Sequence, residues 1–213
     1  LTETNADEEI TAQLAYFERR GMPFEWKLYQ HDRPADLRAR LARFGIETDE
    51  EEAVMVLDLS ARPALLEAAP ATEVRRVTDP AELELLVAIE EAVWARSYTM
   101  MGDVLEETLR QTPDEIAIYL AYADGIPAAS AWVNFHPGTH FASIWGGSTL
   151  AEFRGRGLYT ALLTVRAREA AARRFRFLTV DAGPMSRPIL ARHGFETITY
   201  TYPCEWQPPE ELS

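Results

Sequence analysis

The segment at residues 154–159 constrains the fold most, because it places two glycines between an apolar run and a helical pattern. Residues 141–145 form the apolar run, which predicts a strand, and apolar residues recur at helical spacing from Leu158 onward. Glycines at such a junction let a ligand approach the backbone, and the first amides of the helix lack acceptors within it. The segment therefore predicts an anion-binding site at the N-terminus of a helix that follows a strand.

Three kinds of glycine loop join a strand to a helix, and the residues exclude two of them. The phosphate loop of nucleotide hydrolases ends in Gly-Lys-Ser/Thr, whereas Gly157 is followed here by Leu158 and Tyr159. The dinucleotide fingerprint needs a third glycine where this chain has Thr160. For the segment taken alone, an ordinary surface turn with two solvated arginines stays open as the alternative.

The third kind is the pattern Gln/Arg-x-x-Gly-x-Gly/Ala of the GNAT superfamily of N-acetyltransferases, and residues 154–157 resemble it. Tyr159 departs from the pattern, because it replaces the final small residue. Residues 73–213 are similar to one GNAT domain, since a strand at 175–180 and then Gly194-Phe195 follow in the family's order. The resemblance implies an α/β (α+β) fold with a mixed, mostly antiparallel sheet flanked by helices.

The order of elements predicted from the residues agrees with that resemblance. Asp79-Pro80 begins a helix that runs to about Ala95, and a short helix is predicted around residues 104–109. Two apolar strands flank the turn signal Asp124-Gly125, and Pro137-Gly138 makes the next turn. Three antiparallel strands thus lead into a strand–helix–strand unit.

The resemblance implies that the cofactor is acetyl-coenzyme A, bound by the end of the fourth strand, the loop and the helix start. Arginines at 154, 156, 166, 168, 173 and 174 form a basic island that suits a polyanion, although part of it is expected to be a solvated helix face. The cofactor-binding residues expected are Ser148, Thr149, Leu150, Arg154, Gly155, Arg156, Gly157, Leu158, Tyr159 and Thr160.

Catalytic residues are harder to assign, because the family's usual acid and base are absent. Leu190 stands where the family often has a tyrosine acid, and Ser143 stands where it often has a glutamate base. We expect Ser186 and Tyr200 to be catalytic, against the alternative that each is a solvated or core residue. The other candidates are His140, Tyr202 and Glu205.

Residues at the end of the first helix of the domain are expected to shape the acceptor site. Glu90, Trp94 and Tyr98 lie where the resemblance places the acceptor pocket. Ordinary positions on a helix face are the competing interpretation for all three.

The first 72 residues are predicted to be a partial, degenerate GNAT-like copy with the order helix, strand, helix, strand. Residues 41–48 align with residues 190–197 almost letter for letter, although two amphipathic helix ends can also agree by coincidence. No glycine loop precedes the first helix, so this segment should not bind the cofactor. Its abrupt start at Leu1 suggests lost upstream sequence, and the predicted domain boundary lies between residues 72 and 73.

The amino-acid composition limits the classes of partner that the chain is expected to bind. A net charge of −13 argues against binding nucleic acid and weakly favours a cationic amine. No apolar run reaches the length of a membrane span, and the single cysteine, Cys204, excludes an internal disulfide, so we expect a cytoplasmic protein. No zinc spacing occurs, so no metal is expected, and a homodimer stays open.

The leading hypothesis is an N-acetyltransferase that moves an acetyl group to a primary amine of a small molecule or a protein. The alternative is a non-catalytic acyl-coenzyme A-binding or interaction module.

Overall fold

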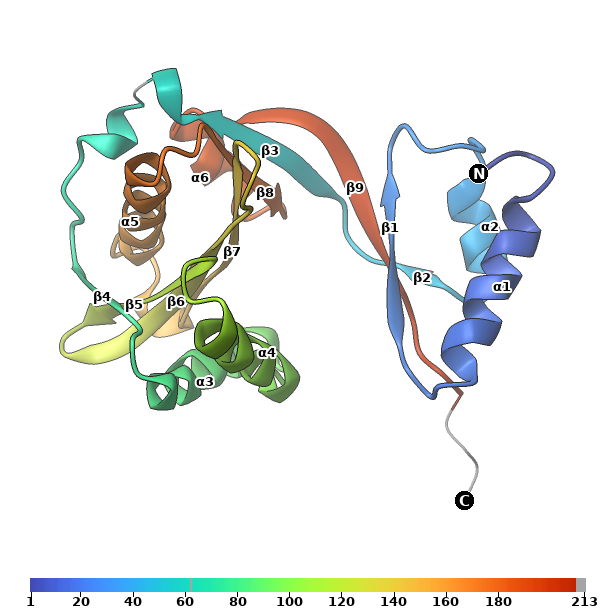
Figure 1. The fold of residues 1–213 in the computed structure, drawn as a ribbon, viewed down its shortest axis with the longest axis horizontal. Helices are drawn as coiled ribbons and strands as arrows, with labels where there is room; N and C mark the ends of the chain where they lie inside the picture. Colours follow the sequence, from blue (N-terminus) through green and yellow to red (C-terminus); the bar gives the residue numbers. More distant parts are fainter. Residues whose placement is uncertain (62, 210–213) are drawn as a thin grey trace. The chain divides into compact units, whose positions relative to one another are not determined.

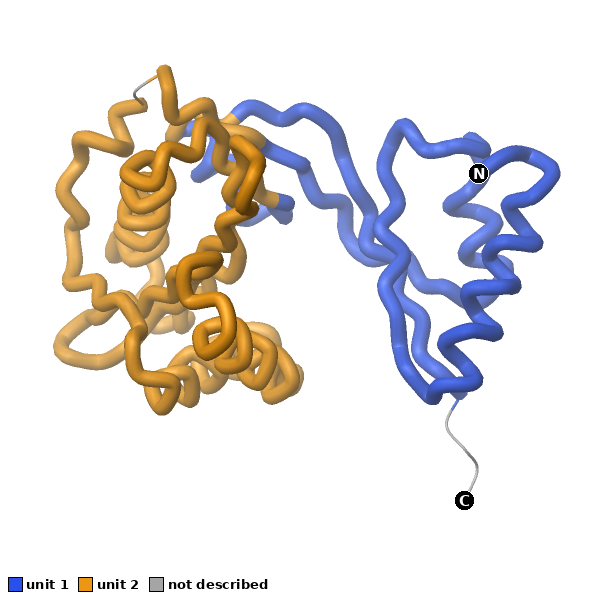
Figure 2. The backbone as a smooth tube through the Cα atoms, viewed as in Figure 1, with its two compact units in different colours: residues 1–55, 181–192, 196–213 blue, residues 56–180, 193–195 orange. Residues whose placement is uncertain are grey.

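A computed structural model describes residues 1–61 and 63–209, and the chain divides into two compact units (Figure 2). Unit 1 comprises residues 1–55, 181–192 and 196–213, and unit 2 comprises residues 56–180 and 193–195. The chain passes from one unit to the other inside β3 (Glu52–Asp58) and inside β8 (Phe177–Ala182). The domain boundary predicted after residue 72 stays a prediction.

Unit 2 contains a mixed sheet with the strand order β8-β7-β6-β5-β4. The strands β4 (Glu73–Arg76), β5 (Ile116–Ala123), β6 (Ile126–Phe135) and β7 (Phe141–Thr149) pair antiparallel in sequence order. β8 pairs parallel with β7. The predicted mixed, mostly antiparallel sheet is therefore confirmed.

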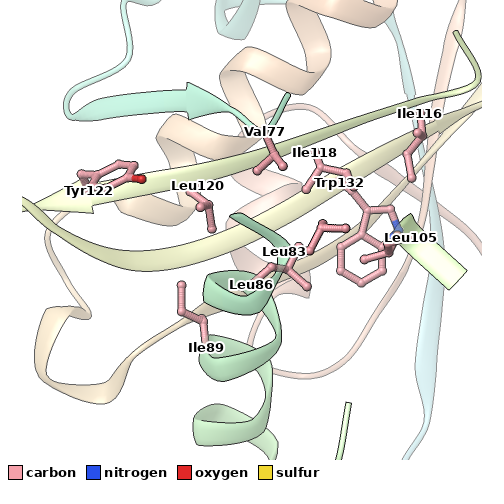
Figure 3. Packing of buried hydrophobic residues seen from close by; sticks show 10 residues of the cluster. All are labelled: Val77, Leu83, Leu86, Ile89, Leu105, Ile116, Ile118, Leu120, Tyr122 and Trp132. Atoms are coloured by element: carbon pink, nitrogen blue, oxygen red, sulfur yellow. The ribbon is translucent and has the colours of Figure 1, made fainter. Parts of the chain in front are cut away.

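Helices cover both faces of this sheet. Successive side chains of β5 point to opposite faces, and all residues of β5 are buried, so both faces need a covering layer. α3 (Leu83–Trp94) and α4 (Thr99–Gln111) pack on one face, where Ile116, Ile118, Leu120 and Trp132 join Leu86 and Leu105 in a buried cluster (Figure 3). α5 (Leu158–Ala172) contacts β5, β6 and β7, and its Glu169 accepts a hydrogen bond of 2.8 Å from Tyr119 on the other face. The predicted α/β (α+β) class with flanking helices is thus confirmed (Figure 1).

Local signals explain most of the element boundaries in unit 2. The Asp79 side chain accepts a hydrogen bond of 3.0 Å from the Ala81 amide, as the predicted helix start requires, and α3 follows the short 3-10 helix Pro80–Glu82. α4 is longer than the predicted helix at residues 104–109, because its first turns also pack against α3, where Gly102 is buried next to Val87. Short 3-10 helices also occur at Leu59–Ala61, Ala64–Leu66 and Ala151–Phe153.

Unit 1 is built around β9 (Glu196–Trp206), which is a hydrogen-bonded neighbour of β3 and pairs antiparallel with two further strands. β1 (Phe24–Tyr29) and β2 (Glu47–Thr48) lie on its two sides, since Cys204 is opposite both Trp26 and Thr48. α1 (Ala6–Glu18) and α2 (Leu37–Arg43) bury Ile10, Leu41 and neighbouring residues in a separate core that includes Cys204. The third helix of this unit is α6 (Arg187–Arg192).

The two segments with similar sequence also begin their strands at equivalent residues. β2 starts at Glu47 and β9 starts at Glu196, which are aligned residues of the repeat. Before each strand a glycine ends the helix in the left-handed region, Gly45 with φ 76° and Gly194 with φ 91°. The duplication itself stays a prediction.

Among the described residues, no helix combines the length and the apolar character that crossing a membrane requires.

Candidate active site

β7 carries a bulge directly before the glycine loop. Ala131 of β6 is opposite Gly146, but Ser130 is opposite Ser148, so Gly147 is an extra residue without a partner in the register. Both glycines have positive φ, 66° at Gly146 and 89° at Gly147. The bulge therefore places two residues without side chains on the strand that leads to the loop.

Two aromatic rings explain why this bulge needs glycines. A Cβ atom at Gly146 would lie 2.7 Å from Cζ3 of Trp132, and one at Gly147 would lie 2.8 Å from Cε2 of Tyr159. Tyr159 is the residue that departs from the predicted loop pattern. Its ring packs against Gly147. The large side chain in the first turn of α5 therefore occupies the space that a side chain at residue 147 of β7 would need.

The parallel pairing of β7 with β8 stops before the bulge. In unit 2 the register runs from Phe141 opposite Phe177 to Ser143 opposite Thr179. β7 continues for six more residues to Thr149. The register of this last part of β7 is with β6 and not with β8. Within the described residues of unit 2, this part of β7 therefore has a strand partner on one side only.

The start of α5 is open to solvent. Residues 154–157 are exposed, Gly155 and Gly157 have φ values of 75° and 82°, and the helix begins at Leu158. Among the described residues, the amides of Gly155, Gly157 and Leu158 have no hydrogen-bond acceptor. A Cβ atom at Gly155 would meet nothing within 4 Å. This exposed helix mouth fits an anionic group such as a diphosphate.

The predicted strand contribution to the site is only partly available. The amide of Leu150 donates a hydrogen bond of 3.0 Å to the Ala128 carbonyl, so Leu150 does not offer its amide to a ligand. Thr149 Oγ1 is buried and has no partner among the described residues. Thr160, also predicted as a cofactor-binding residue, lies in the first turn of α5 and accepts a bond of 2.9 Å on its carbonyl from Thr164 Oγ1.

Most arginines of the basic island predicted from the sequence are engaged within the protein. Arg156 forms a bidentate ion pair with Asp124, with N–O distances of 2.8 and 3.0 Å. Arg154 donates from Nε to the Thr149 carbonyl at 3.2 Å. Arg168 donates to the Leu66 carbonyl and Arg173 pairs with Glu169.

Arg166, which was predicted to be part of the basic island, is buried, with only 1% of the residue exposed. Its guanidinium donates to the carbonyls of Leu162, Trp145 and Trp132 at 3.0, 3.0 and 3.4 Å, and Nη2 has no partner among the described residues. Burial lowers the pKa of Arg166 to about 10. The Trp145 carbonyl immediately precedes the bulge, so this buried cation holds the strand where Gly146 bends it.

Glu90 and Trp94, predicted for the acceptor site, and Ser148, predicted for the cofactor site, form one hydrogen-bond network with Ser130. Ser148 Oγ donates to Glu90 at 2.6 Å, Ser130 Oγ at 2.7 Å and the Trp94 indole at 3.2 Å. The Trp94 indole also donates to Ser148 Oγ at 3.0 Å. Glu90 is 1% exposed, and this burial raises its pKa, although the hydrogen bonds act in the opposite direction.

The network has a buried part, which includes Glu90 and Ser148, and an exposed part at Trp94. Trp94 is 52% exposed although its indole nitrogen points inward. The third predicted acceptor residue, Tyr98, is separate from the network. Its amide donates to Glu91 at 2.9 Å, and its hydroxyl accepts from Arg96 at 3.1 Å.

A second polar cluster, on β7 and the turn before it, was not predicted. His136 Nε2 lies 2.9 Å from Ser143 Oγ, and the Trp145 indole donates to the same oxygen at 2.9 Å. His136 follows Asn134, the partner of Ser143, by two residues, so the three side chains share one face of the sheet. The strand period and the short turn could have indicated this contact, but the sequence does not specify the register between the strands.

The predicted catalytic residues lie in unit 1. Ser186 precedes α6, and its hydroxyl donates to the Gly183 carbonyl at 3.2 Å. Tyr200 is on β9, with the Arg187 guanidinium 5.8 Å from its ring centre. Their catalytic roles stay predictions. Two surface grooves have linings that do not include the loop, one along Phe17, Phe24 and Trp26 and one between α3 and α4.

Comparisons with known proteins identify what this arrangement is similar to. A family profile described as an acetyltransferase (GNAT) domain matches residues 58–186. A search of curated proteins gave no match.

Solved structures with a similar fold share little sequence. A GCN5-related N-acetyltransferase from Kribbella flavida has a TM-score of 0.69 and 16% identity, covering 100% of this chain and 79% of that chain. A tandem GNAT protein from the clavulanic acid biosynthesis pathway has a TM-score of 0.63 and 16% identity, covering 98% and 72%. An aminoglycoside N-acetyltransferase in complex with CoA has a TM-score of 0.50 and 21% identity, covering 59% and 88%. At these identities the likeness concerns the fold.

Proposed function

Because this chain belongs to the GNAT acetyltransferase family, we propose that it moves an acetyl group from acetyl-coenzyme A to a primary amine of a small molecule or a protein. The observation that supports this most is the exposed start of α5, where Gly155, Gly157 and Leu158 present amides without acceptors among the described residues. An anion is stabilised there by unpaired donors and by the helix dipole.

The residues present fit the diphosphate of coenzyme A. Gly155 leaves open the space that a side chain would fill, and Arg154 is exposed beside it. The amides of residues 155–160 would hold the diphosphate, and the edge of β7 from Gly147 to Thr149 would hold the pantetheine arm. Arg156 is engaged with Asp124, so the backbone rather than this side chain is the main anion donor.

Bound acetyl-coenzyme A supplies a thioester whose carbonyl carbon is attacked by the amine and whose thiolate leaves. The protein's part is to orient the acetyl group and to place donors where negative charge develops. Arg166 holds the Trp145 carbonyl, and Glu90 holds the Ser148 side chain, so both sides of the bulge are fixed before a ligand binds. A prearranged strand edge is what such stabilisation requires.

We also propose that the first 72 residues are a degenerate copy that binds no cofactor. α1 starts at Ala6 without a preceding glycine loop, whereas α5 follows Gly155 and Gly157. The tandem GNAT protein with a similar fold supports this proposal only by analogy. We therefore expect a single coenzyme A site in each chain.

The proposal is tested by measuring thiol release from acetyl-coenzyme A with a panel of polyamines, aminoglycosides and amino acids, and cofactor binding by calorimetry. Gly155→Ala is the key variant, because its Cβ enters the open space at the helix mouth without meeting protein atoms. We expect it to weaken coenzyme A binding about tenfold or more, which is about 1.4 kcal/mol.

Gly45→Ala is the matched control, because Gly45 has φ 76° and a Cβ atom added to it would also meet nothing within 4 Å. Both variants carry the same backbone strain, so an equal loss of thermal stability with unequal loss of binding isolates the ligand site. Binding without turnover on any amine would favour the non-catalytic module. Unchanged affinity in Gly155→Ala would remove the coenzyme A site from the start of α5.

A further inference from the structure

The cluster of His136, Ser143 and Trp145 lies at the point where β7 loses its parallel partner. Ser143 is the last residue of β7 in register with β8, and the bulge begins three residues later. The cluster is accessible, because His136 is exposed and Trp145 is 46% exposed. The cluster therefore lies on β7, the strand to which we assign the acetyl donor, a few residues before the bulge.

The hydrogen bonds of this cluster have a defined direction at one end. An indole N–H can only donate, so Trp145 donates to Ser143 Oγ and fixes the position of that oxygen. The Ser143 hydroxyl proton then remains available for His136 Nε2 when the imidazole is neutral. When the imidazole is protonated, Nε2–H donates to the second lone pair of Ser143 Oγ, so the contact holds in both protonation states.

We propose that His136, acting through Ser143, removes the proton that a primary ammonium group must lose before it can attack the thioester. The inference rests on the proposed function. One N–H bond of the ammonium breaks and its electron pair stays on nitrogen. The proton passes to Ser143 Oγ, directly or across water, while the Ser143 hydroxyl proton passes to His136 Nε2. The resulting imidazolium is exposed and returns the proton to solvent.

The His136 side chain is exposed to solvent. No ion pair within residues 1–61 and 63–209 includes its ring. The amide of Phe135, the residue before His136, donates to the Glu115 carbonyl at 2.7 Å, and the Arg176 amide donates to the carbonyl of His140 at 3.0 Å. The Arg176 guanidinium is engaged with Asp58. Histidine is the side chain that ordinarily exchanges a proton near neutral pH, which suits a base for this step.

The test compares the pH dependence of amine acetylation in four variants with that of the unmodified chain. His136→Gln and Ser143→Ala remove the two members of the relay, Ser143→Thr restores a hydroxyl, and His31→Gln is the control at another exposed histidine. We expect the first two variants to lose about 100-fold in kcat at neutral pH. This deficit should shrink as the pH approaches the pKa of the acceptor amine, because free amine then forms without the protein's help.

Ser143→Thr should recover most of the rate, and His31→Gln should match the unmodified chain. Acetyl-coenzyme A affinity, measured by calorimetry, should be the same in all of them. The proposal is overturned if His136→Gln behaves like His31→Gln, or if its loss of rate is equal at every pH, as a purely structural effect would be. Absence of coenzyme A binding or of transfer by the unmodified chain would instead contradict the proposed function, and this inference with it.

Discussion

Glu90 experiences two opposing effects inside unit 2. Burial favours its neutral form, whereas Ser148, Ser130 and Trp94 donate to the carboxylate and favour the charged form. Burial is the larger effect, so the pKa of Glu90 is raised above its ordinary value of 4.5. In the folded protein, this residue therefore binds its proton more tightly than it does in the unfolded chain.

A pH dependence of stability follows from that shift. As the pH rises above 4.5, the unfolded chain releases the Glu90 proton before the folded protein does, so the free energy of unfolding falls through this window. Glu90→Gln removes the effect while keeping an oxygen for Ser148 and Trp94 and an amide for Ser130. We expect Glu90→Gln to gain stability relative to the unmodified chain as the pH rises, by about 1.4 kcal/mol for each pKa unit.

Urea unfolding at several pH values measures this difference. Glu90→Ala serves as the contrast, because it removes both carboxylate oxygens and leaves buried hydroxyls without a partner, at a cost of about 1–3 kcal/mol. A Glu90→Gln variant that loses stability by the same amount at every pH would show that the charge of Glu90 is not opposed by its burial.

The sequence predicts the backbone conformation of some residues correctly, but it does not predict contacts that depend on distant parts of the chain. The glycines at 155 and 157 are predicted to take a conformation that side chains disfavour, and both have positive φ. Arg166 could not be placed correctly, because the helical pattern indicates one buried face, whereas α5 also buries the polar side of that helix against the sheet. His136 and Ser143 are missed as a pair because their contact depends on the register between strands.

Two elements meet at the loop that begins α5. The turn between β5 and β6 presents Asp124, whose carboxylate takes both terminal nitrogens of Arg156. Hydrogen bonding to Arg156 lowers the pKa of Asp124, so the pair stays charged at neutral pH. Arg156 is thereby directed toward the hairpin rather than toward the open amides of the helix.

This ion pair predicts the effect of one isosteric change. Asp124→Asn should raise coenzyme A affinity by about three- to tenfold at low salt, because it releases Arg156 to the bound diphosphate. Asparagine tolerates the left-handed conformation that Asp124 adopts, with φ 55°, so the turn should keep its shape.

Calorimetry at low and high salt measures this gain, which added salt should diminish. The double variant Asp124→Asn, Arg156→Ala is the control and should show no gain. A loss of affinity in Asp124→Asn would mean that Asp124 holds Arg156 in a binding position.

The strands of the sheet in unit 2 were predicted in the correct order because hydrophobic period and turn signals are local properties of the sequence. The bulge in β7 was not, although Gly146-Gly147 is visible in the sequence, since a bulge exists only relative to the partner strand. The rings of Trp132 and Tyr159 that require those glycines come from other elements.

The division into two units depends on contacts between residues far apart in the chain. β9 belongs to the core formed by the first 55 residues, because Cys204 packs with Ile10 and Leu41 and the strand pairs with β1 and β2. No local signal in residues 196–206 indicates these partners. The grouping of strands into units therefore could not be predicted from composition, and the predicted boundary after residue 72 stays a prediction.

The central claim is that exposed amides at the start of α5 bind the diphosphate of coenzyme A, and hydrogen exchange of backbone amides tests it most directly. Exchange is recorded residue by residue with and without coenzyme A. The claim predicts that residues 155–160 exchange more slowly in the complex, together with residues 147–149 of β7. Slower exchange confined to the groove between α3 and α4 or to unit 1, with residues 155–160 unchanged, would contradict it.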